Sequence, residues 1–267
     1  MTPQTPIERW PDVLEAAIAA AGPPLARLVL LRETASTQDH ARDSGATPGT
    51  VVVAWRQTAG RGRLGRAWAD TATDGVAATF VLPDMPPEAL AMRSAVAAAA
   101  AVRAFVPGDA AGIKWPNDVV ADGRKLAGVL VERTGGAALV GIGINALQRA
   151  FPPPLDATAA SIAMLAGPPD RLAVVAELVR SVAAAMAMDG PSVTGTYRSL
   201  DRLAGRPCAF LTPGGRVEGI VEEVDPAEGI RVRTPAGPQF LPAQTTSVVP
   251  PEGGNRYFPR NAPDGPG

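Results

Sequence analysis

Three β-favouring runs separated by two tight turns lie in the middle of the chain, and they constrain its fold more than any other feature. Residues 112–145 read GIKWPNDVVADGRKLAGVLVERTGGAALVGIGIN. Asp122-Gly123 and Gly135-Gly136 separate the runs, and both pairs are two-residue hairpin signals because these turns need backbone conformations that glycine tolerates. We therefore predict that this part of the chain forms an antiparallel sheet.

Helical and extended segments are interspersed before and after this region. Pro11 and the pair Gly22-Pro23 bound an expected helix over residues 11–21, and a capping-box spacing at Ser36 opens a second helix that ends near residue 44. Further helices are expected over residues 87–105 and within 156–203, where apolar residues recur at helical spacing. Strands are expected at residues 27–34, 51–55 and 76–82.

The residue pattern changes from helical to β-favouring at Arg206. From there to about residue 250, short runs such as CAFLT, RVEGIVEEV and GIRVRT are separated by glycine and proline turns. This pattern is typical of a small β-barrel. We predict a first domain over residues 1–203, a small C-terminal domain over 204–250 and a disordered tail over 251–267.

Composition excludes several kinds of chemistry. The chain has 267 residues, with one His, His40, and one Cys, Cys208, so no disulfide, Cys/His zinc site or Cys-His nucleophile pair is expected. The net charge of −1 disfavours a surface that binds nucleic acid or anionic lipid throughout. The chain shows neither a membrane-length apolar run nor a signal-peptide pattern, and we expect a cytoplasmic protein.

Lysine is scarce, and its two occurrences are close together. Of 25 basic residues 23 are Arg, and the only two lysines are Lys114 and Lys125. An ammonium group is a compact point charge that can reach a phosphate or a carboxylate, whereas a guanidinium is a planar fork. The two lysines therefore mark a candidate anion site, if the neighbouring residues support one.

A loop rich in arginine and glycine follows the strand at residues 51–55. The segment 56–68 reads RQTAGRGRLGRAW, and it carries four arginines and no acidic residue between Arg56 and Arg66. Such a loop suits an anion, because glycine lets the backbone approach a ligand closely. It matches G-x-G-x-x-G formally, but residues 67–75 are too short for the crossover helix of a dinucleotide-binding unit. An exposed basic loop without a ligand is the alternative.

Both lysines lie in the predicted hairpin region. Lys114 begins KWPND and Lys125 lies in RKLAGVLVE, and the Asp122-Gly123 turn would bring Asn117 and Asp118 alongside the strand beyond Lys125. Two ammonium groups, an amide and a carboxylate would then surround one pocket and could orient a reacting carboxyl group. The alternative is an exposed hairpin with ordinary surface charges.

Two weaker motifs complete the set. GIGIN ends a buried strand, where its glycines suggest close backbone approach and Asn145 supplies both a donor and an acceptor. A core strand that ends in a turn would look the same. Ser36-Thr37-Gln38 reads as an N-cap when it is considered alone.

Taken in order, STQ, QTAGRGRLGRAW, KWPND, RKLAGVLVE and GIGIN resemble the biotin protein ligase family over about residues 30–248. The resemblance implies an α+β fold, with a mixed, largely antiparallel sheet and helices of the class II synthetase type, followed by an SH3-like domain. It implies that biotin and ATP form biotinyl-5′-AMP, and that a lysine of an apo biotin carboxyl carrier protein then attacks this adenylate. Mg²⁺ is expected mainly through the ATP phosphates, without a protein metal site.

The resemblance also implies roles for individual residues. Those expected at biotin are Ser36, Thr37, Gln38, Gln57, Arg61, Gly62, Arg63 and Lys125. Those expected at ATP are Arg61, Arg63, Arg66, Trp68, Lys114, Asn117, Asp118 and Asn145. The catalytic residues are expected to be Lys125, Arg63 and Asp118.

The sequence departs from the family at Gln38 and in the segment TATDGVAATFVLP after Trp68, from which no site residue is carried over. Gln38 stands where the family usually has Asn, so an amide is kept but is one methylene longer. Too few residues precede the first expected strand for the winged helix of the repressor members, and we expect no binding to DNA.

Two alternative functions compete with biotin ligation. A lipoate or octanoate ligase or transferase shares the fold, but would lack GRGRLGR and KWPND. A nucleic-acid-binding protein could use the loop over residues 56–66, but the net charge and the lack of interleaved aromatic residues count against it.

Overall fold

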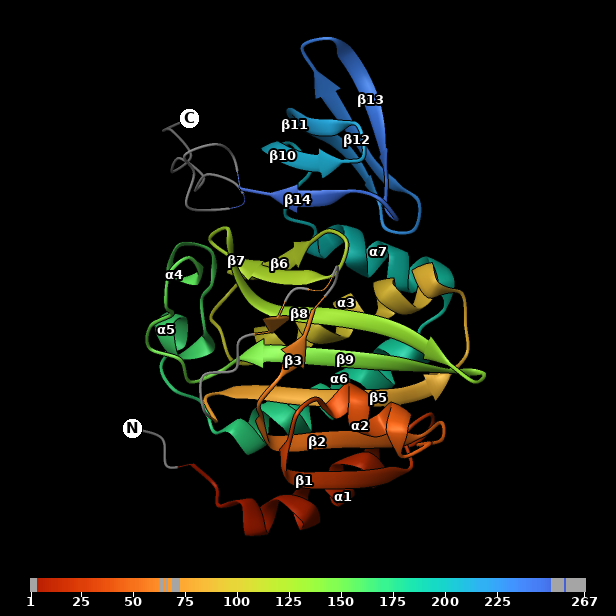
Figure 1. The fold of residues 1–267 in the computed structure, drawn as a ribbon, viewed down its shortest axis with the longest axis vertical. Helices are drawn as coiled ribbons and strands as arrows, with labels where there is room; N and C mark the ends of the chain where they lie inside the picture. Colours follow the sequence, from red (N-terminus) through yellow and green to blue (C-terminus); the bar gives the residue numbers. More distant parts are fainter. Residues whose placement is uncertain (1–3, 63–64, 66, 69–72, 251–256, 258–267) are drawn as a thin grey trace.

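A seven-stranded mixed sheet forms the body of the protein in a computed structural model, which describes residues 4–62, 65, 67–68, 73–250 and 257 (Figure 1). The strands follow the order β1-β2-β5-β9-β8-β7-β6, in which β1 and β2 are parallel and every other pair is antiparallel. Their bounds are β1 Arg27–Thr34, β2 Thr50–Gln57, β5 Gly75–Pro83, β6 Ala111–Lys114, β7 Asp118–Ala121, β8 Arg124–Thr134 and β9 Ala137–Asn145. The predicted mixed, largely antiparallel sheet is confirmed.

Both predicted hairpins are present. Asp122 and Gly123 join β7 to β8 with φ values of 54° and 68°, and Gly135 and Gly136 join β8 to β9 with 48° and 88°. Positive φ at both central residues is the requirement of the tightest hairpin turns. The two turns thus set β7, β8 and β9 side by side.

Helices α3 and α6 cover one face of this sheet, and α2 packs on the other face (Figure 1). On β9, Ala138, Val140, Ile142 and Ile144 belong to the main apolar core together with residues of α3 and α6. The helices are α1 Trp10–Ala21, α2 Thr37–Asp43, α3 Pro87–Arg103, α4 Leu155–Thr158, α5 Ile162–Ala166, α6 Arg171–Ala187 and α7 Gly190–Leu200, with a 3-10 turn η1 at Ile7–Arg9. Strand alternation therefore turns the intervening residues of β9 toward the open face.

A short ribbon lies on that open face. It consists of β3 Gly60–Arg61 and β4 Ala67–Trp68, which pair with each other as a separate two-stranded sheet. Residues 62–66 of the arginine-rich loop connect them. Of its residues, Arg63 and Arg66 lie outside the residues that the structure describes.

The C-terminal region forms a second, five-stranded antiparallel sheet in the order β13-β12-β11-β10-β14. Its strands are β10 Pro207–Thr212, β11 Gly215–Asp225, β12 Gly229–Thr234, β13 Gly237–Pro242 and β14 Ser247–Val249. The predicted small SH3-like domain is confirmed, but its sheet is open rather than closed into a barrel, since its edge strands β13 and β14 do not pair with each other within the described residues. Edge strand β13 carries Pro238 and Pro242, which lack an amide hydrogen, and β14 has only three residues.

The ends of the other helices and strands agree with the predicted ends to within a few residues. The predicted helical segment over residues 156–203 divides into α4, α5, α6 and α7. The predicted division at residues 203 and 204 stays a prediction, although the second sheet begins at Pro207. The predicted disordered tail lies outside the described residues apart from Tyr257. Within the described residues, no helix is long and apolar enough to cross a lipid bilayer.

Candidate active site

A pocket opens on the face of the large sheet that α3 and α6 do not cover. It is bordered by α2, the β3–β4 ribbon, the KWPND turn, the segment at residues 151–159 and the edge of β14. All the predicted site residues that the structure describes line this pocket: Ser36, Thr37, Gln38, Gln57, Arg61, Gly62, Trp68, Lys114, Asn117, Asp118, Lys125 and Asn145. Five motifs that are far apart in the sequence therefore meet at one cavity.

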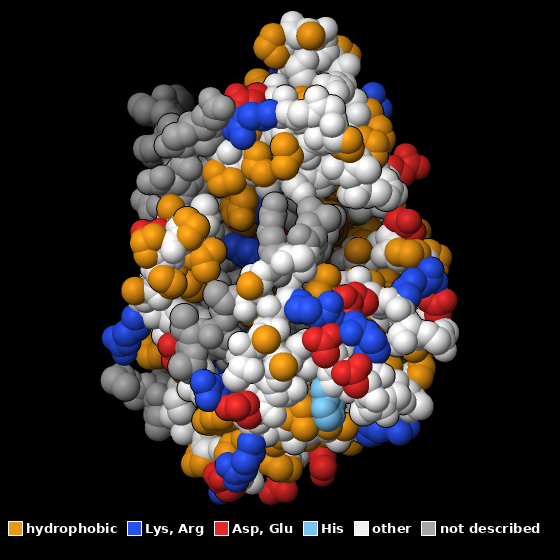
Figure 2. Space-filling model, viewed as in Figure 1, with side chains coloured by type: hydrophobic (Ala, Val, Ile, Leu, Met, Phe, Trp, Pro, Cys, Tyr) orange, Lys and Arg blue, Asp and Glu red, His pale blue; other side chains and the backbone are white. Residues whose placement is uncertain are grey.

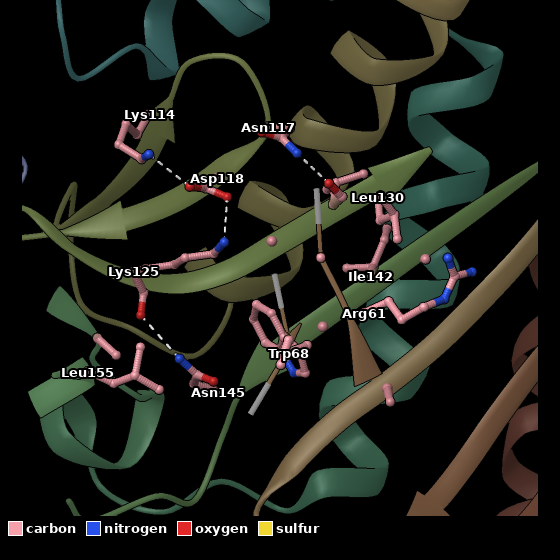
Figure 3. Close-up of a pocket in the computed structure, with 18 of the residues that line it drawn as sticks. Arg61, Trp68, Lys114, Asn117, Asp118, Lys125, Leu130, Ile142, Asn145 and Leu155 are labelled. Atoms are coloured by element: carbon pink, nitrogen blue, oxygen red, sulfur yellow. Dashed lines mark hydrogen bonds and ion pairs between the residues drawn. The ribbon is translucent and has the colours of Figure 1, made fainter. Parts of the chain in front are cut away.

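An ion triad forms one end of the pocket. Asp118 receives Lys125 Nζ on Oδ1 at 2.7 Å and Lys114 Nζ on Oδ2 at 2.8 Å (Figure 3). The side chain of Lys114 is only 6% exposed and that of Asp118 13%, whereas Lys125 keeps 28% of its surface open to the pocket. Two positive charges share one carboxylate, so this end of the pocket carries a net positive charge.

A register shift turns Lys125 toward the pocket. Asp118 pairs with Gly128 and Val119 with Ala127, but the next pair is Val120 with Lys125, which leaves Leu126 without a partner. An extra residue of this kind re-aims the side chains on its own strand. Lys125 consequently points to the same face as Asp118, while Leu126 is fully buried in the core.

The lysines also fix the ionisation of Asp118. Burial by itself would raise the pKa of this carboxyl, but the two ammonium groups outweigh burial, and they hold the pKa well below its usual range. Asp118 is thus a permanent anion at physiological pH and a weak base. It can orient ammonium groups, but it is poorly suited to remove a proton from one.

Neutral polar groups form the other end of the pocket. Ser36 caps α2 by accepting the amide of Asp39 at 3.3 Å, and this cap fixes the entry of the STQ motif. Gln57 Oε1 accepts the Thr37 amide at 2.9 Å and its hydroxyl at 3.2 Å, and Thr79 donates to the Thr37 hydroxyl at 2.9 Å. These buried hydroxyl and amide groups offer donors and acceptors without net charge.

Gln38 reaches the floor of the pocket from α2. Its Nε2 atom donates to the carbonyls of Leu139 at 3.3 Å and Leu130 at 3.5 Å, at the junction of β8 and β9. A Cβ atom on Gly141 would lie 2.2 Å from Gln38 Oε1. The missing side chain of Gly141 therefore makes the space that the longer amide occupies.

Trp68 lies across a floor of two paired glycines. Gly128 and Gly143 face each other on β8 and β9, and a Cβ atom on them would come within 3.0 Å and 2.5 Å of the indole, respectively. Lys125 Nζ lies 5.3 Å from the centre of the Trp68 ring. The close backbone approach that the glycines of GIGIN suggested is thus confirmed, and in the structure its partners are side chains.

The two asparagines hold backbone in place. Asn145 Nδ2 donates to the carbonyls of Lys125 at 3.1 Å and Ala160 at 3.0 Å, so it ties the backbone of Lys125 to the neighbouring segment. Asn117 Nδ2 donates to the Val129 carbonyl across the hairpin. Tyr197 of α7 supports the same turn by donating its hydroxyl to the Pro116 carbonyl at 3.1 Å.

Sequence reasoning missed several pocket residues. Gly128 is one of them, although glycine inside an apolar strand signals close approach. Phe151, Ser247 and Tyr257 border the pocket from segments in which no motif distinguishes them. Lys114 Nζ lies 3.9 Å from the centre of the Tyr257 ring, so one residue of the C-terminal tail reaches the ion triad.

Comparison with known proteins decides the family. Residues 30–148 match the model of the biotin/lipoate A/B protein ligase family. The biotin–[acetyl-CoA-carboxylase] ligase of Mycobacterium tuberculosis is 33% identical over 78% of this chain and 84% of its own length. The enzyme of the same name from Paracoccus denitrificans is 30% identical over 80% of this chain and 97% of its own length. This chain belongs to the biotin protein ligase family.

A solved structure supports the same assignment. The biotin protein ligase from Aquifex aeolicus in complex with biotin and ATP superposes with a TM-score of 0.75 at 26% identity, over 84% of this chain and 99% of that one. The fold of this family member is thus that of a biotin protein ligase, including a small C-terminal sheet of the SH3-like type. Its pocket has the neutral end and the cationic end described above.

Proposed function

We propose that the pocket joins biotin to ATP, with formation of biotinyl-5′-AMP, and then transfers biotin to a lysine of a biotin carboxyl carrier protein. The observation that carries this proposal is the Lys114–Asp118–Lys125 triad at one end of a pocket whose other end is polar and uncharged. A carboxylate and a phosphate need the first environment, and a ureido ring needs the second.

Biotin occupies the pocket with its ring at the neutral end. Ser36, Thr37, Gln38 and Gln57 offer the hydroxyl and amide groups that a cyclic urea can pair with. The Arg61-Gly62 backbone closes one wall of this end. The valerate chain then directs the carboxylate across Trp68 toward Lys125.

Adenylation brings two anions together, and the lysines oppose their repulsion. A carboxylate oxygen of biotin attacks the α-phosphorus of ATP, the new C–O–P linkage forms, and the bond to the β-phosphate breaks with release of pyrophosphate. Lys125, which is open to the pocket, contacts the carboxylate and the α-phosphate, and Lys114 lies behind it. Each lysine stabilises charge that grows on the phosphoryl oxygens during the reaction. Trp68, Asn117 and Asn145 shape the nucleotide side, and Arg63 and Arg66 contribute further positive charge.

Transfer of biotin to the carrier protein uses the same end of the pocket. The uncharged ε-amine of the carrier lysine attacks the carbonyl of the mixed anhydride, an amide forms, and AMP departs with the bonding electrons. Asp118 attracts and orients the incoming amine. Its depressed pKa makes it a poor proton acceptor, so the proton is transferred to solvent or to phosphate oxygens.

Mg²⁺ would be held by the phosphates of ATP rather than by a set of protein ligands. Asp118 is a carboxylate of the pocket wall, but both of its oxygens are bonded to lysines, and no cluster of three or more His, Cys, Asp or Glu exists among the described residues. Such a donor set fits a cation that keeps its ligands on phosphate and water. Mg²⁺ neutralises the leaving pyrophosphate when it is bound.

The alternative functions have weaker support. The lipoate and octanoate ligases and transferases share the family model, but their acyl substrates have no ureido ring to use the amides at the neutral end. Basic and acidic side chains are intermixed on the face in Figure 2, where the described residues form no continuous basic surface for nucleic acid. The absence of DNA binding and a cytoplasmic location stay predictions.

The test is biotinylation of an apo biotin carboxyl carrier domain by the purified protein with MgATP. Biotin, lipoate and octanoate are supplied in parallel, and intact-mass spectrometry of the carrier measures the product. The proposal predicts a carrier that gains one biotin and neither of the other acyl groups. A carrier that stays unmodified with biotin, or that gains lipoate or octanoate equally well, would contradict it.

A further inference from the structure

Arg61 makes contacts that its expected role does not account for. Its guanidinium does not point at the ion triad, but extends in the opposite direction from Lys125 (Figure 3). Nη1 and Nη2 contact the two carboxylate oxygens of Glu132, each at 2.8 Å, and Nη2 also lies 2.8 Å from Asp39 Oδ1. Glu132 is the last residue of RKLAGVLVE, and none of the steps above uses it.

Arg42 closes these contacts into a ring of four charges. Its Nη1 contacts Asp39 Oδ1 at 2.7 Å, and its Nη2 contacts Glu132 Oε2. Positive and negative groups alternate around the ring, which we call the Arg61 network: Arg61, Asp39, Arg42 and Glu132. Three separate elements contribute to it, namely β3, α2 and β8.

The Arg61 network differs from the ion pair that Arg133 forms beside it on β8. Arg133, the neighbour of Glu132, forms an ion pair with Asp84, and the two side chains are 50% and 41% exposed. The carboxylates of the network are more covered, with Glu132 26% and Asp39 33% exposed. A bidentate arginine–carboxylate ion pair within a network is stronger than an isolated exposed ion pair. Hydrogen bonding to Glu132 raises the pKa of Arg61 accordingly.

The network attaches a segment that the large sheet does not hold. The β3–β4 ribbon pairs only with itself within the described residues, yet Arg61 and Gly62 line the pocket. Amides of Thr58 and Ala59 bond the carbonyls of Thr34 and Ala35 at 3.0 Å and 2.8 Å, which fixes the approach to the ribbon. The side chain of Arg61 then joins the ribbon itself to α2 and β8.

We propose that Glu132, Asp39 and Arg42 are positioning residues of the ligase, which hold the ribbon against the pocket through Arg61 and so retain biotin and its adenylate. The inference deepens the proposed function and rests on it. Asp39 directly follows Gln38 at the neutral end, so the anchor of the ribbon and the biotin-facing end of α2 are parts of one structure. A ribbon released from the anchor leaves the reacting groups in place but opens the wall beside the bound ligand.

The test uses E132Q, which keeps the size of the side chain and removes its charge. We expect the Kd for biotin and the rate of release of preformed biotinyl-AMP each to rise about three- to tenfold, with kcat at saturating biotin within about twofold of wild type. The matched control is D84N, which removes the carboxylate from the exposed pair with Arg133 and should change neither constant. D39N is the second variant, with the same expected direction, and it decides the matter if E132Q does not fold.

A double-mutant cycle distinguishes positioning from general stabilisation. If Glu132 acts through Arg61, then adding E132Q to R61Q produces little further change in the Kd for biotin, whereas independent effects would multiply. Wild-type biotin affinity and unchanged adenylate release in folded E132Q and D39N would overturn the inference. Failure of the wild-type protein to form biotinyl-AMP would instead contradict the proposed function, so the two failures are distinguishable.

Discussion

Lys125 and Asp118 lie on adjacent strands with their charged atoms 2.7 Å apart, and an unpaired Leu126 is what turns Lys125 to the side of Asp118. The contact joins the two motifs, KWPND and RKLAGVLVE, that carry all the lysine of the chain. It also leaves Lys125 partly open to the pocket, where a substrate carboxylate can replace or extend its contact with Asp118. The first predictions concern this pair.

Replacement of Lys125 by Ala should remove activity with little loss of stability. Asp118 keeps Lys114 as a partner, and Lys125 is partly exposed, so the fold retains its buried ion pair. We expect the rate of biotinyl-AMP formation to fall by a factor of about 10²–10³, because a donor aimed at developing charge is lost. Lys125→Arg should restore little, since a planar fork does not fit the place of a point charge.

Single-turnover quench experiments measure that rate, and thermal denaturation measures stability. Arg133→Ala is the control and should keep wild-type adenylation, because Arg133 lies near the other end of β8 from Lys125, has a 50% exposed side chain and does not line the pocket. Wild-type adenylation in Lys125→Ala would show that this lysine is not the activating group.

Asp118→Asn should be destabilising, in contrast to Lys125→Ala. The buried ammonium of Lys114 would lose its counter-charge, and breaking a buried ion pair on one side costs about 3 kcal/mol. Urea unfolding at pH 7 measures this difference in the free energy of unfolding. A variant as stable as wild type would contradict the account of the triad.

The same carboxylate predicts a pH dependence of stability. The pKa of Asp118 is lower in the folded protein than in the unfolded chain, so its ion pairs stabilise the fold fully above the ordinary carboxyl pKa of about 3.9. This contribution is lost as pH falls from there toward the folded-state pKa. The difference in unfolding free energy between wild type and Asp118→Asn should therefore be constant from pH 5 to 7 and shrink below pH 4.

Gln38 and Gly141 should behave as a matched pair. Gly141→Ala places a methyl group where Gln38 Oε1 lies, and we expect it to destabilise the protein and weaken biotin binding. In a Gln38→Asn background the shorter amide leaves room, so the same change should be tolerated. Thermal denaturation and titration calorimetry of the four proteins test this coupling, and additive effects would contradict it.

Gly143→Ala should displace Trp68 from the glycine floor. A Cβ atom there would lie 2.5 Å from the indole, a separation that cannot persist, so the ring has to move. We expect a changed tryptophan fluorescence and a raised KM for ATP. Gly195→Ala in α7 is the control, because a Cβ atom there meets nothing within 4 Å, and it should leave both unchanged.

Turn chemistry predicted which strands pair, because it is a local property, whereas the full set of pocket residues was predicted from the resemblance to the family. Asp122-Gly123 and Gly135-Gly136 specified two hairpins, and the glycines of GIGIN indicated the close approach that the structure shows at Gly141 and Gly143. The side-chain contacts of the pocket residues could not be predicted from the sequence. Tertiary packing determines three of these features. They are the register shift at Leu126, the ion pairs of Arg61 with Glu132 and Asp39, and the contact of Tyr257 with Lys114.

In the C-terminal sheet, the strands could be predicted from the sequence but the closure of the sheet could not. Short runs parted by glycine and proline predicted the strands over residues 207–249, but they do not determine whether the last edge closes onto the first. Closure depends on strand length and on amide donors at the edges, and Pro238 and Pro242 reduce those donors. The open sheet is the result.

The central claim is that this pocket joins the carboxylate of biotin to the α-phosphate of ATP. The most direct measurement is mass spectrometry of the bound small molecules after the purified protein is incubated with biotin and MgATP in the absence of carrier protein. The account predicts one equivalent of biotinyl-5′-AMP per folded wild-type protein, together with pyrophosphate. Folded protein that binds biotin and ATP but yields no biotinyl-5′-AMP would contradict it.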